Sequence, residues 1–252
     1  MSTTLSDHAW ERIHSILATH PNVRTTAGTR LFLTAWLWML RTGAQWRELP
    51  ERFGKWNSVY KRVARWSKLD VFDHVLEELS RDADYEWLMV DSTTCRAHMS
   101  AAGAPASAGG QQAQSLGRSR GGFSTKIHIK TEALGMPLEI TLTPGNRGDM
   151  IGVWALLEPE DACASYFLAD AAYDANKLRD FLEQIQVEAV IPSNPSRNSK
   201  PACDRELYKA RHAIECFINK LKWFRRIATR YDKLDVTYLG FLKFACCLIW
   251  LR

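Results

Sequence analysis

Residues 87–94, WLMVDSTT, mark the point at which the sequence changes from a helical pattern to a strand pattern. Four apolar residues precede Asp91 and a short polar run, which is typical of a buried strand that ends at an acid. A carboxylate is costly to bury without a partner. We therefore expect Asp91 at the carboxyl edge of a sheet, where open α/β sheets place their functional sites.

The sequence downstream of this strand alternates between strand and helix patterns. Residues 122–145 read as a hairpin, and 165–174 and 188–194 as further strands. Residues 149–158 and 175–186 have the apolar spacing of helices. This order predicts the α/β class, a mixed sheet with helices on its faces.

Residues 1–83 read as helices, so we expect a small all-α domain at 1–83 and an α/β domain at 84–252. Residues 101–122 are rich in Ala, Gly, Ser and Gln without a hydrophobic period, which predicts a flexible loop. The end of that loop is basic, at Arg118 and Arg120.

The helix expected at residues 57–68, NSVYKRVARWSK, carries Lys61, Arg62 and Arg65 with aromatic residues between them. Such a basic helix after a Gly-containing turn is compatible with the recognition helix of a helix-turn-helix unit that binds DNA. The alternative is a surface helix with a basic face, and the sequence leaves both open.

Composition excludes several classes of protein. The six cysteines include no C-x-x-C pair, so neither a zinc site nor a secreted disulfide framework is indicated. The apolar run at 238–252 contains Lys243 and is too short to span a bilayer. No signal-peptide pattern opens the chain. We expect a cytoplasmic protein without a membrane partner, and the formal charge of +5 permits a nucleic-acid partner.

Two further acids stand out by their context. Asp170 directly follows the apolar run YFLA, as Asp91 follows WLMV, and Glu215 lies within the amphipathic helical pattern of residues 208–222, YKARHAIECFINKLK. At 100° per residue, the side chains of Tyr208, Arg211, Glu215 and Lys222 fall within about 60° of arc. That stripe could be part of a site, or a solvated helix face with an Arg211–Glu215 ion pair.

Carboxylate oxygens are ligands that suit Mg²⁺ or Mn²⁺. Two such ions can activate an attacking oxygen and stabilise a leaving oxygen in phosphoryl transfer. Basic side chains near Glu215 would hold a phosphodiester backbone. The basic residues in question are Arg211, Lys222, Arg225, Arg226 and Arg230.

The spacing Tyr208-x2-Arg211-x3-Glu215-x6-Lys222 resembles the Y-x2-R-x3-E-x6-K signature of DDE transposases of bacterial insertion sequences. The segments RTGAQWRELPERFGKWNSVYKR, GRSRGGFSTKIH, LTPGNRGD and LADAAYD also look like the short-element branch of that family. The resemblance therefore extends over nearly the whole chain.

The resemblance implies a ribonuclease H-like catalytic domain in which Asp91, Asp170 and Glu215 are the catalytic, metal-binding triad. It implies hydrolysis of DNA at the element ends, then attack of the freed 3′-OH on target DNA, with Mg²⁺ or Mn²⁺. Double-stranded DNA would be the partner of a homodimer associated with the nucleoid. Residues expected to contact DNA are Tyr208, Arg211, Lys222, Arg225, Arg226, Arg118, Arg120, Lys61, Arg62 and Arg65.

Two kinds of alternative accompany this reading. Asp174 competes with Asp170 for the second position, although Asp174 also stands where an N-cap for the helix at 175–186 is wanted. At the level of function, the chain could be a DNA-binding regulator without catalysis. A glycosidase with a pair of acids is disfavoured, because Arg and Lys beside Glu215 suit phosphate better than sugar.

Overall fold

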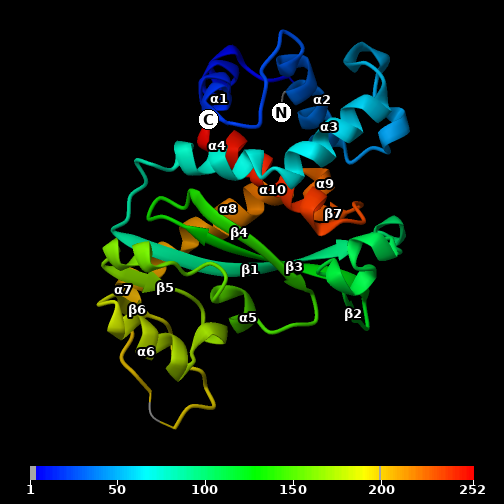
Figure 1. Ribbon diagram of the computed structural model, residues 1–252. Coiled ribbons are helices and arrows are strands. Elements are labelled where there is room, and N and C mark those ends of the chain that lie inside the picture. Colours follow the sequence, from blue (N-terminus) through cyan, green and yellow to red (C-terminus); the bar gives the residue numbers. More distant parts are fainter. Residues whose placement is uncertain (1–3, 199) are drawn as a thin grey trace.

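The computed structural model describes residues 4–198 and 200–252. A helical layer lies on one side of a long twisted sheet, and smaller helices cover the other face (Figure 1). The first four helices are α1 (Asp7–Thr19), α2 (Thr29–Thr42), α3 (Trp56–Lys68) and α4 (Val71–Leu79). Residues 43–55, which include two 3-10 turns, connect α2 to α3.

The sheet has seven strands within the described residues. They are β1 (Trp87–Ala97), β2 (Gly117–Ser119), β3 (Gly122–Thr131), β4 (Pro137–Pro144), β5 (Tyr166–Leu168), β6 (Glu188–Val190) and β7 (Thr229–Arg230). Strand β1 is central: β3 pairs with it antiparallel on one side, and β5 pairs with it parallel on the other. Strand β4 continues antiparallel from β3, and β6 continues parallel from β5. This mixed sheet with helices on both faces confirms the predicted α/β class.

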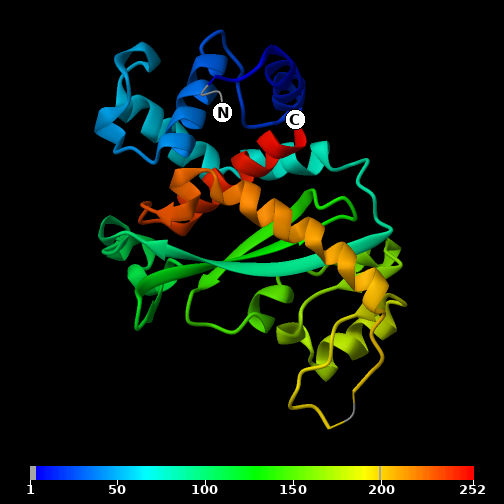
Figure 2. The same ribbon diagram turned by 180° about the vertical axis from the view of Figure 1, so that it is seen from behind.

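Helices on both faces bury the sheet. The remaining helices are α5 (Met150–Val153), α6 (Asn176–Gln184), α7 (Arg205–Tyr208), α8 (His212–Lys222), α9 (Arg225–Ala228) and α10 (Asp235–Trp250). Apolar residues of α1–α4, α8 and α10 form one large core with one face of the sheet. A smaller core lies on the opposite face, under α5 and α6. Seen from behind, α8 runs diagonally across the sheet (Figure 2).

The helix α5 is shorter than the sequence pattern predicted. Only residues 150–153 of the expected 149–158 are α-helical, and turns follow. Gly152 lets this turn approach the sheet, because a Cβ there would lie 2.1 Å from Cγ of the His128 ring. The segment therefore owes its conformation to packing against β3, which hydrophobic spacing does not report.

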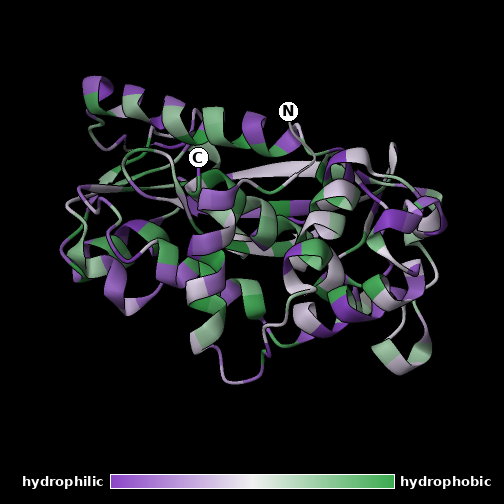
Figure 3. Cartoon of the chain, turned by 90° about the horizontal axis from the view of Figure 1, so that it is seen from above, coloured by the Kyte–Doolittle hydropathy of each residue, from purple (hydrophilic) through white to green (hydrophobic). Residues whose placement is uncertain are grey.

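The apolar C-terminal run forms α10, whose side chains are buried almost throughout. It packs against α3 and α4 on one side and β4 on the other, so the N-terminal helices and the sheet share one core. Within residues 4–198 and 200–252, no helix has the length and apolar character needed to cross a membrane. Green and purple segments intermingle along the surface helices in Figure 3, as expected for amphipathic elements.

Residues 101–122 contain short 3-10 turns and β2. Gln114 fixes part of this segment, because its amide donates to the carbonyl of Ala108 at 2.6 Å and its Oε1 accepts from the Asp235 N–H at 3.0 Å. Thr125 Oγ1 also donates to the carbonyl of Ser115 at 2.8 Å. The segment thus contacts the start of α10, and its mobility stays a prediction.

Candidate active site

Asp91 and Asp170 occupy matching positions on neighbouring parallel strands. The register of β1 and β5 pairs Leu88 with Phe167 and Met89 with Leu168. Asp91 and Asp170 each lie two residues beyond that last pair. Because the pairing is parallel and in register up to Leu168, Asp170 follows the end of β5 beside Asp91 on β1.

The prediction that the first strand ends at Asp91 is wrong. Strand β1 continues to Ala97, six residues further, because β3 pairs with it through Arg96. Strand β5, in contrast, ends at Leu168, so β1 has no β5 neighbour from Asp91 onward. Asp91 therefore lies in the middle of β1, next to the point where β5 ends.

Strand alternation directs Asp91 toward α8. Met89 belongs to the large core and its neighbours Leu88 and Val90 to the small one. Asp91, two residues after Met89, must point to the same side as Met89, where α8 lies. Helix α8 is anchored there by Ile214 and Phe217, both buried.

Arg211, in the 3-10 turn before α8, connects two of the acids. Its Nη2 lies 2.6 Å from Oδ2 of Asp91, and its Nη1 lies 2.6 Å from Oε1 of Glu215. The side chains of Arg211 and Asp91 are 12% and 14% exposed, and that of Glu215 is 49% exposed. The sequence left two alternatives for this stripe, a solvated ion pair or part of a site, and the structure has features of both. Arg211 pairs with Glu215, and the same guanidinium also pairs with Asp91 on β1.

The three carboxylates interact electrostatically. Burial raises the pKa of Asp91, and the negative charges of Asp170 and Glu215 raise it further. The Arg211 guanidinium and the hydrogen bond from the Ser92 N–H lower it. Burial alone would lower the pKa of Arg211, but the surrounding acids, Asp91 first, raise it above its ordinary value. The guanidinium is thus the charge that makes this acidic cluster tolerable.

Asp174 has a structural role. Its carboxylate accepts from Arg179 Nε at 2.8 Å, from Arg197 Nη1 at 3.1 Å and from the Asn194 N–H at 2.7 Å. The N-cap of α6 is Ala175, so the expectation that Asp174 caps this helix is wrong. Because its hydrogen-bonding capacity is used within the fold, Asp174 is a poor candidate for the site.

A second polar cluster lies behind Asp91, and the sequence did not single it out. Ser92 points away from Asp91 and donates to Asp149 at 2.5 Å, and Asp149 also accepts from Lys126 Nζ at 2.8 Å. Tyr173 is 1% exposed and lies near this cluster, where burial and Asp149 raise its pKa. The available signal was Asp149, the aspartate in LTPGNRGD, five residues after the end of β4.

The acids fit a divalent cation by type, but their present arrangement does not. Asp91, Asp170 and Glu215 supply the hard oxygen ligands that Mg²⁺ and Mn²⁺ prefer. In the described part of the chain, no group of three His, Cys, Asp or Glu side chains is placed to hold a metal ion. The Arg211 guanidinium lies between Asp91 and Glu215, where a metal ion bound by these two acids would supply the positive charge.

Most basic residues predicted to contact DNA are exposed. Lys222 and Arg225 lie at the end of α8 and the start of α9, and Tyr208 is half-buried before Arg211. The other exposed members of the predicted set are Arg118, Arg120, Lys61 and Arg65. They remain candidates for contact with a phosphate backbone.

The prediction that Arg226 contacts DNA is wrong. It is 2% exposed, and its Nε and Nη2 donate to the carboxylate of Asp232 at 3.0 and 2.8 Å. Its Nη1 donates to the carbonyl of Ala44 at 3.1 Å, and the guanidinium lies over the ring of Trp46. These contacts join α9 to the N-terminal helical region and leave no surface for DNA.

The prediction that Arg62 contacts DNA is also wrong. Its guanidinium carbon lies 4.3 Å from the ring centre of Phe32 and 5.0 Å from that of Trp66, and Nη2 donates to Thr29 at 2.9 Å. Burial lowers its pKa. Arg62 therefore packs α3 onto α2, whereas Lys61 and Arg65 on the same helix face outward.

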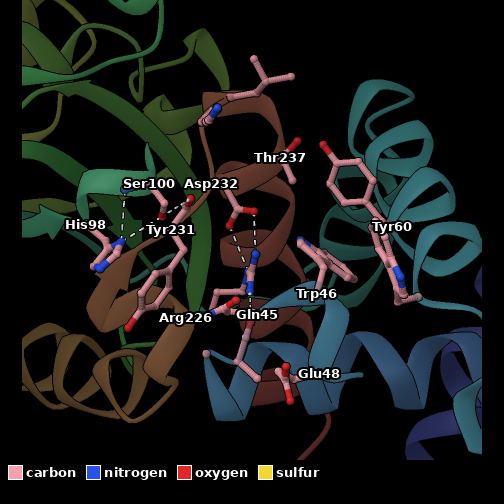
Figure 4. A pocket seen from close by; sticks show the side chains of 15 residues that line it. Gln45, Trp46, Glu48, Tyr60, His98, Ser100, Arg226, Tyr231, Asp232 and Thr237 are labelled. Atoms are coloured by element: carbon pink, nitrogen blue, oxygen red, sulfur yellow. Dashed lines mark hydrogen bonds and ion pairs between the residues drawn. The ribbon is translucent and has the colours of Figure 1, made fainter. Parts of the chain in front are cut away.

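A cavity of about 810 Å³ lies between the helical region and the α9–α10 connection. Arg226 and Asp232 form one wall with Trp46 beside them, and Tyr60 and Tyr231 face the space from opposite sides (Figure 4). None of the three candidate acids lines it. This cavity is thus separate from the carboxylate site.

Comparisons with known proteins cover both parts of the chain. Residues 5–76 match the family model described as "Putative transposase of IS4/5 family", and residues 82–250 match "Transposase DDE domain". The proposed boundary between residues 83 and 84 itself stays a prediction.

Curated relatives agree in kind. A Brucella ovis protein named as a transposase for insertion sequence element IS6501 is 46% identical over 131 residues, which are 52% of this chain and 100% of the relative. A Burkholderia cepacia protein named as a transposase for element IS402 is 30% identical over 135 residues, which are 50% of this chain and 62% of that protein.

Solved structures give weaker likenesses. A pre-cleavage Mos1 transpososome aligns with 92% of this chain and 81% of its own at 15% identity, with a TM-score of 0.26. The Mos1 paired-end complex with Mn aligns with 99% and 89% at 16% identity, with a TM-score of 0.28. At these scores the likeness carries no argument about this chain.

Proposed function

Because this chain belongs to the DDE transposases of insertion sequences, we propose that it binds the terminal inverted repeats of its element and cleaves DNA there. Water attacks the phosphorus at the element end, loses a proton, and frees a 3′-OH. That hydroxyl attacks a phosphorus of target DNA and loses its proton, and the target's 3′-oxygen leaves. No covalent bond to the protein is needed.

The register of Asp91 with Asp170 supports this proposal most directly. Two parallel strands bring carboxylates together that lie far apart in the sequence, and α8 adds Glu215 through Arg211. We propose these three acids as the catalytic, metal-binding triad. A divalent ion bound by them would activate the attacking oxygen and stabilise the leaving one.

The chain's own side chains have further roles in this proposal. The exposed Lys222 and Arg225 hold phosphates next to the acids, and half-buried Tyr208 borders the same stripe. Lys61 and Arg65 on α3, with Arg118 and Arg120, extend the basic surface. Two protomers would pair the two element ends, so we propose a homodimer on DNA, associated with the nucleoid.

A cleavage assay tests the proposal. The substrate is duplex DNA that carries the terminal repeats, incubated with Mg²⁺ or Mn²⁺. Asp91→Asn, Asp170→Asn and Glu215→Gln should each abolish cleavage and leave binding to the duplex largely intact. Asp174→Asn is the matched comparison from the same connection. Normal cleavage by one of the three variants would remove that residue from the proposed triad.

The alternative is a DNA-binding regulator without catalysis. It predicts that the wild-type protein binds the repeats but never nicks them at any divalent-metal concentration. The pairing of Asp91 and Glu215 with one arginine favours the enzyme, because a DNA-binding surface gains nothing from carboxylates that repel phosphate.

A further inference from the structure

Arg211 stands where a metal ion would be needed. Its two terminal nitrogens each hold one carboxylate oxygen, Asp91 from the sheet and Glu215 from α8, both at 2.6 Å. We propose that Arg211 is a latch: it occupies the carboxylates in the free protein and releases them to a divalent ion only when a DNA phosphate takes its guanidinium. This inference rests on the proposed function of the same acids.

The Arg211–Asp91 ion pair, the inner pair, supplies most of the strength of the latch. Arg211 and Asp91 are both largely removed from water, so this pair is screened little by solvent or salt. Glu215 is half-exposed, and its pair with Arg211 contributes correspondingly less. The inner pair therefore decides whether the acids are free.

The cluster cannot lose the guanidinium without a replacement. The side chain of Asp91 is only 14% exposed, and Arg211 lies 2.6 Å from both Asp91 and Glu215. Withdrawing Arg211 would leave these acids uncompensated. A metal ion would restore the balance, but it cannot enter while the guanidinium remains, because the two cations would compete for the same oxygens.

DNA offers Arg211 a better partner than it has now. Its Nε is buried and has no hydrogen-bond partner among the described residues. A phosphate can accept two parallel N–H bonds from one guanidinium, an arrangement in which Nε can take part. Arrival of a phosphate thus lets the side chain turn from the acids to DNA, and the acids become free for metal.

Linkage makes the consequence measurable. If DNA raises the affinity of the acids for a metal ion, the metal must raise the affinity for DNA by the same factor. Arg211 would carry that coupling, so the free protein would bind metal weakly and the DNA-bound protein tightly. Phosphodiester hydrolysis would then be confined to complexes in which DNA is already seated.

Mn²⁺ binding to the full chain, followed by the electron paramagnetic resonance signal of free Mn²⁺, tests this without an activity readout. In the absence of DNA, Arg211→Gln should bind Mn²⁺ about tenfold more tightly than the wild type, a coupling of ordinary size. Arg211→Lys should fall between them, because an ammonium lacks the planar fork that holds two carboxylates at once. Adding a generic DNA duplex should tighten Mn²⁺ binding to the wild type and change Arg211→Gln much less.

Lys220→Gln is the matched control, since it removes an exposed charge from the same helix, α8, at a residue with no ion pair to an acid in the described structure. We expect its Mn²⁺ affinity to stay within about twofold of the wild type, because solvent screens an exposed charge. The latch is overturned if Arg211→Gln gains no more affinity than Lys220→Gln. It is also overturned if the gain survives in the Arg211→Gln/Asp91→Asn double variant. The cleavage assay on Asp91→Asn judges the proposed function separately.

The wild-type measurement with and without duplex keeps the proposal falsifiable even if the Arg211 variants fold poorly. Equal Mn²⁺ affinity in both conditions would exclude the latch whatever the variants do. A thermal melt followed by circular dichroism confirms that each variant compared is folded.

Discussion

Asp170 and Asp174 belong to one short connection after β5, yet their carboxylates have opposite surroundings. Asp170 is half-exposed and accepts a hydrogen bond from the Ala172 N–H at 2.9 Å. The side chain of Asp174 is 0% exposed and is held by Arg179 and Arg197. One acid faces the site, and the other fixes the chain behind it.

This difference predicts that the two substitutions separate function from stability. Asp174→Asn should lower the free energy of unfolding by about 2–3 kcal/mol, because it removes the charge from buried hydrogen bonds. Asp170→Asn should change it by less than about 0.5 kcal/mol, as expected away from buried contacts. Urea unfolding of both variants measures the contrast, and equal losses would contradict it.

Arg225 and Arg226 are adjacent in sequence and make the next matched pair. Arg226→Ala should lower the free energy of unfolding by about 3–5 kcal/mol, because Asp232 would be left buried without its partner. Arg225→Ala removes an exposed side chain and should leave unfolding almost unchanged.

Binding to DNA should show the opposite order for the two arginines. Arg225→Ala should weaken binding and lower its salt dependence, as expected for a lost phosphate contact. The measurement is a salt titration of binding to duplex DNA. If Arg225→Ala left both affinity and salt slope unchanged, this arginine would lie outside the DNA surface.

Much of the sheet could be predicted from the sequence. The apolar runs before Asp91 and Asp170 each became a strand, and the hairpin at 122–145 became β3 and β4, as expected. Local patterns sufficed here, because buried strands and hairpin turns carry their own signals. The strand length beyond Asp91 was missed, since its polar residues pair with β3 on a half-exposed surface.

The candidate site was only partly predictable, and Arg226 shows why. A basic residue next to a signature helix reads as a DNA contact, but its partner Asp232 and the carbonyl of Ala44 come from other elements. Burial of this kind is a property of the packed fold. The Arg211–Asp91 pair likewise joins residues 120 apart in the sequence, and no local pattern could reveal it.

Gly135 links the β3–β4 turn to the start of α8. Its φ is +78°, and a Cβ there would lie 2.8 Å from the carbonyl oxygen of Ala213. Gly135→Ala should therefore strain the turn and displace the first turn of α8, which positions Arg211 and Glu215. We expect a loss of more than about 1 kcal/mol in unfolding free energy and a matching loss of cleavage.

Gly103→Ala controls for the strain alone. Gly103 has a similar φ of +77°, but no heavy atom lies within 4 Å of its added Cβ. If both alanine variants lose the same stability and activity, the contact with α8 is irrelevant. Unfolding by urea and the cleavage assay are measured on both proteins.

The lowered pKa of buried His128 predicts how the free energy of unfolding depends on pH. The ring is 0% exposed, its Nε2 lies 2.7 Å from Thr143 Oγ1, and Nδ1 has no partner among the described residues. Burial, aided by Lys126 and opposed by Asp149, lowers its pKa from 6.5 to about 4. Protonation therefore favours the unfolded chain, and stability should fall as the pH drops through the window from 6.5 toward about 4.

Substituting His128 should flatten this dependence. Between pH 7 and pH 5, the wild type should lose about 2 kcal/mol of unfolding free energy through this ring, and His128→Gln should not. Urea unfolding at the two pH values gives the difference. His8 is exposed on α1, so His8→Gln should keep the wild-type slope. A wild-type slope in His128→Gln would mean that the native protein accepts the charged ring, against the burial seen here.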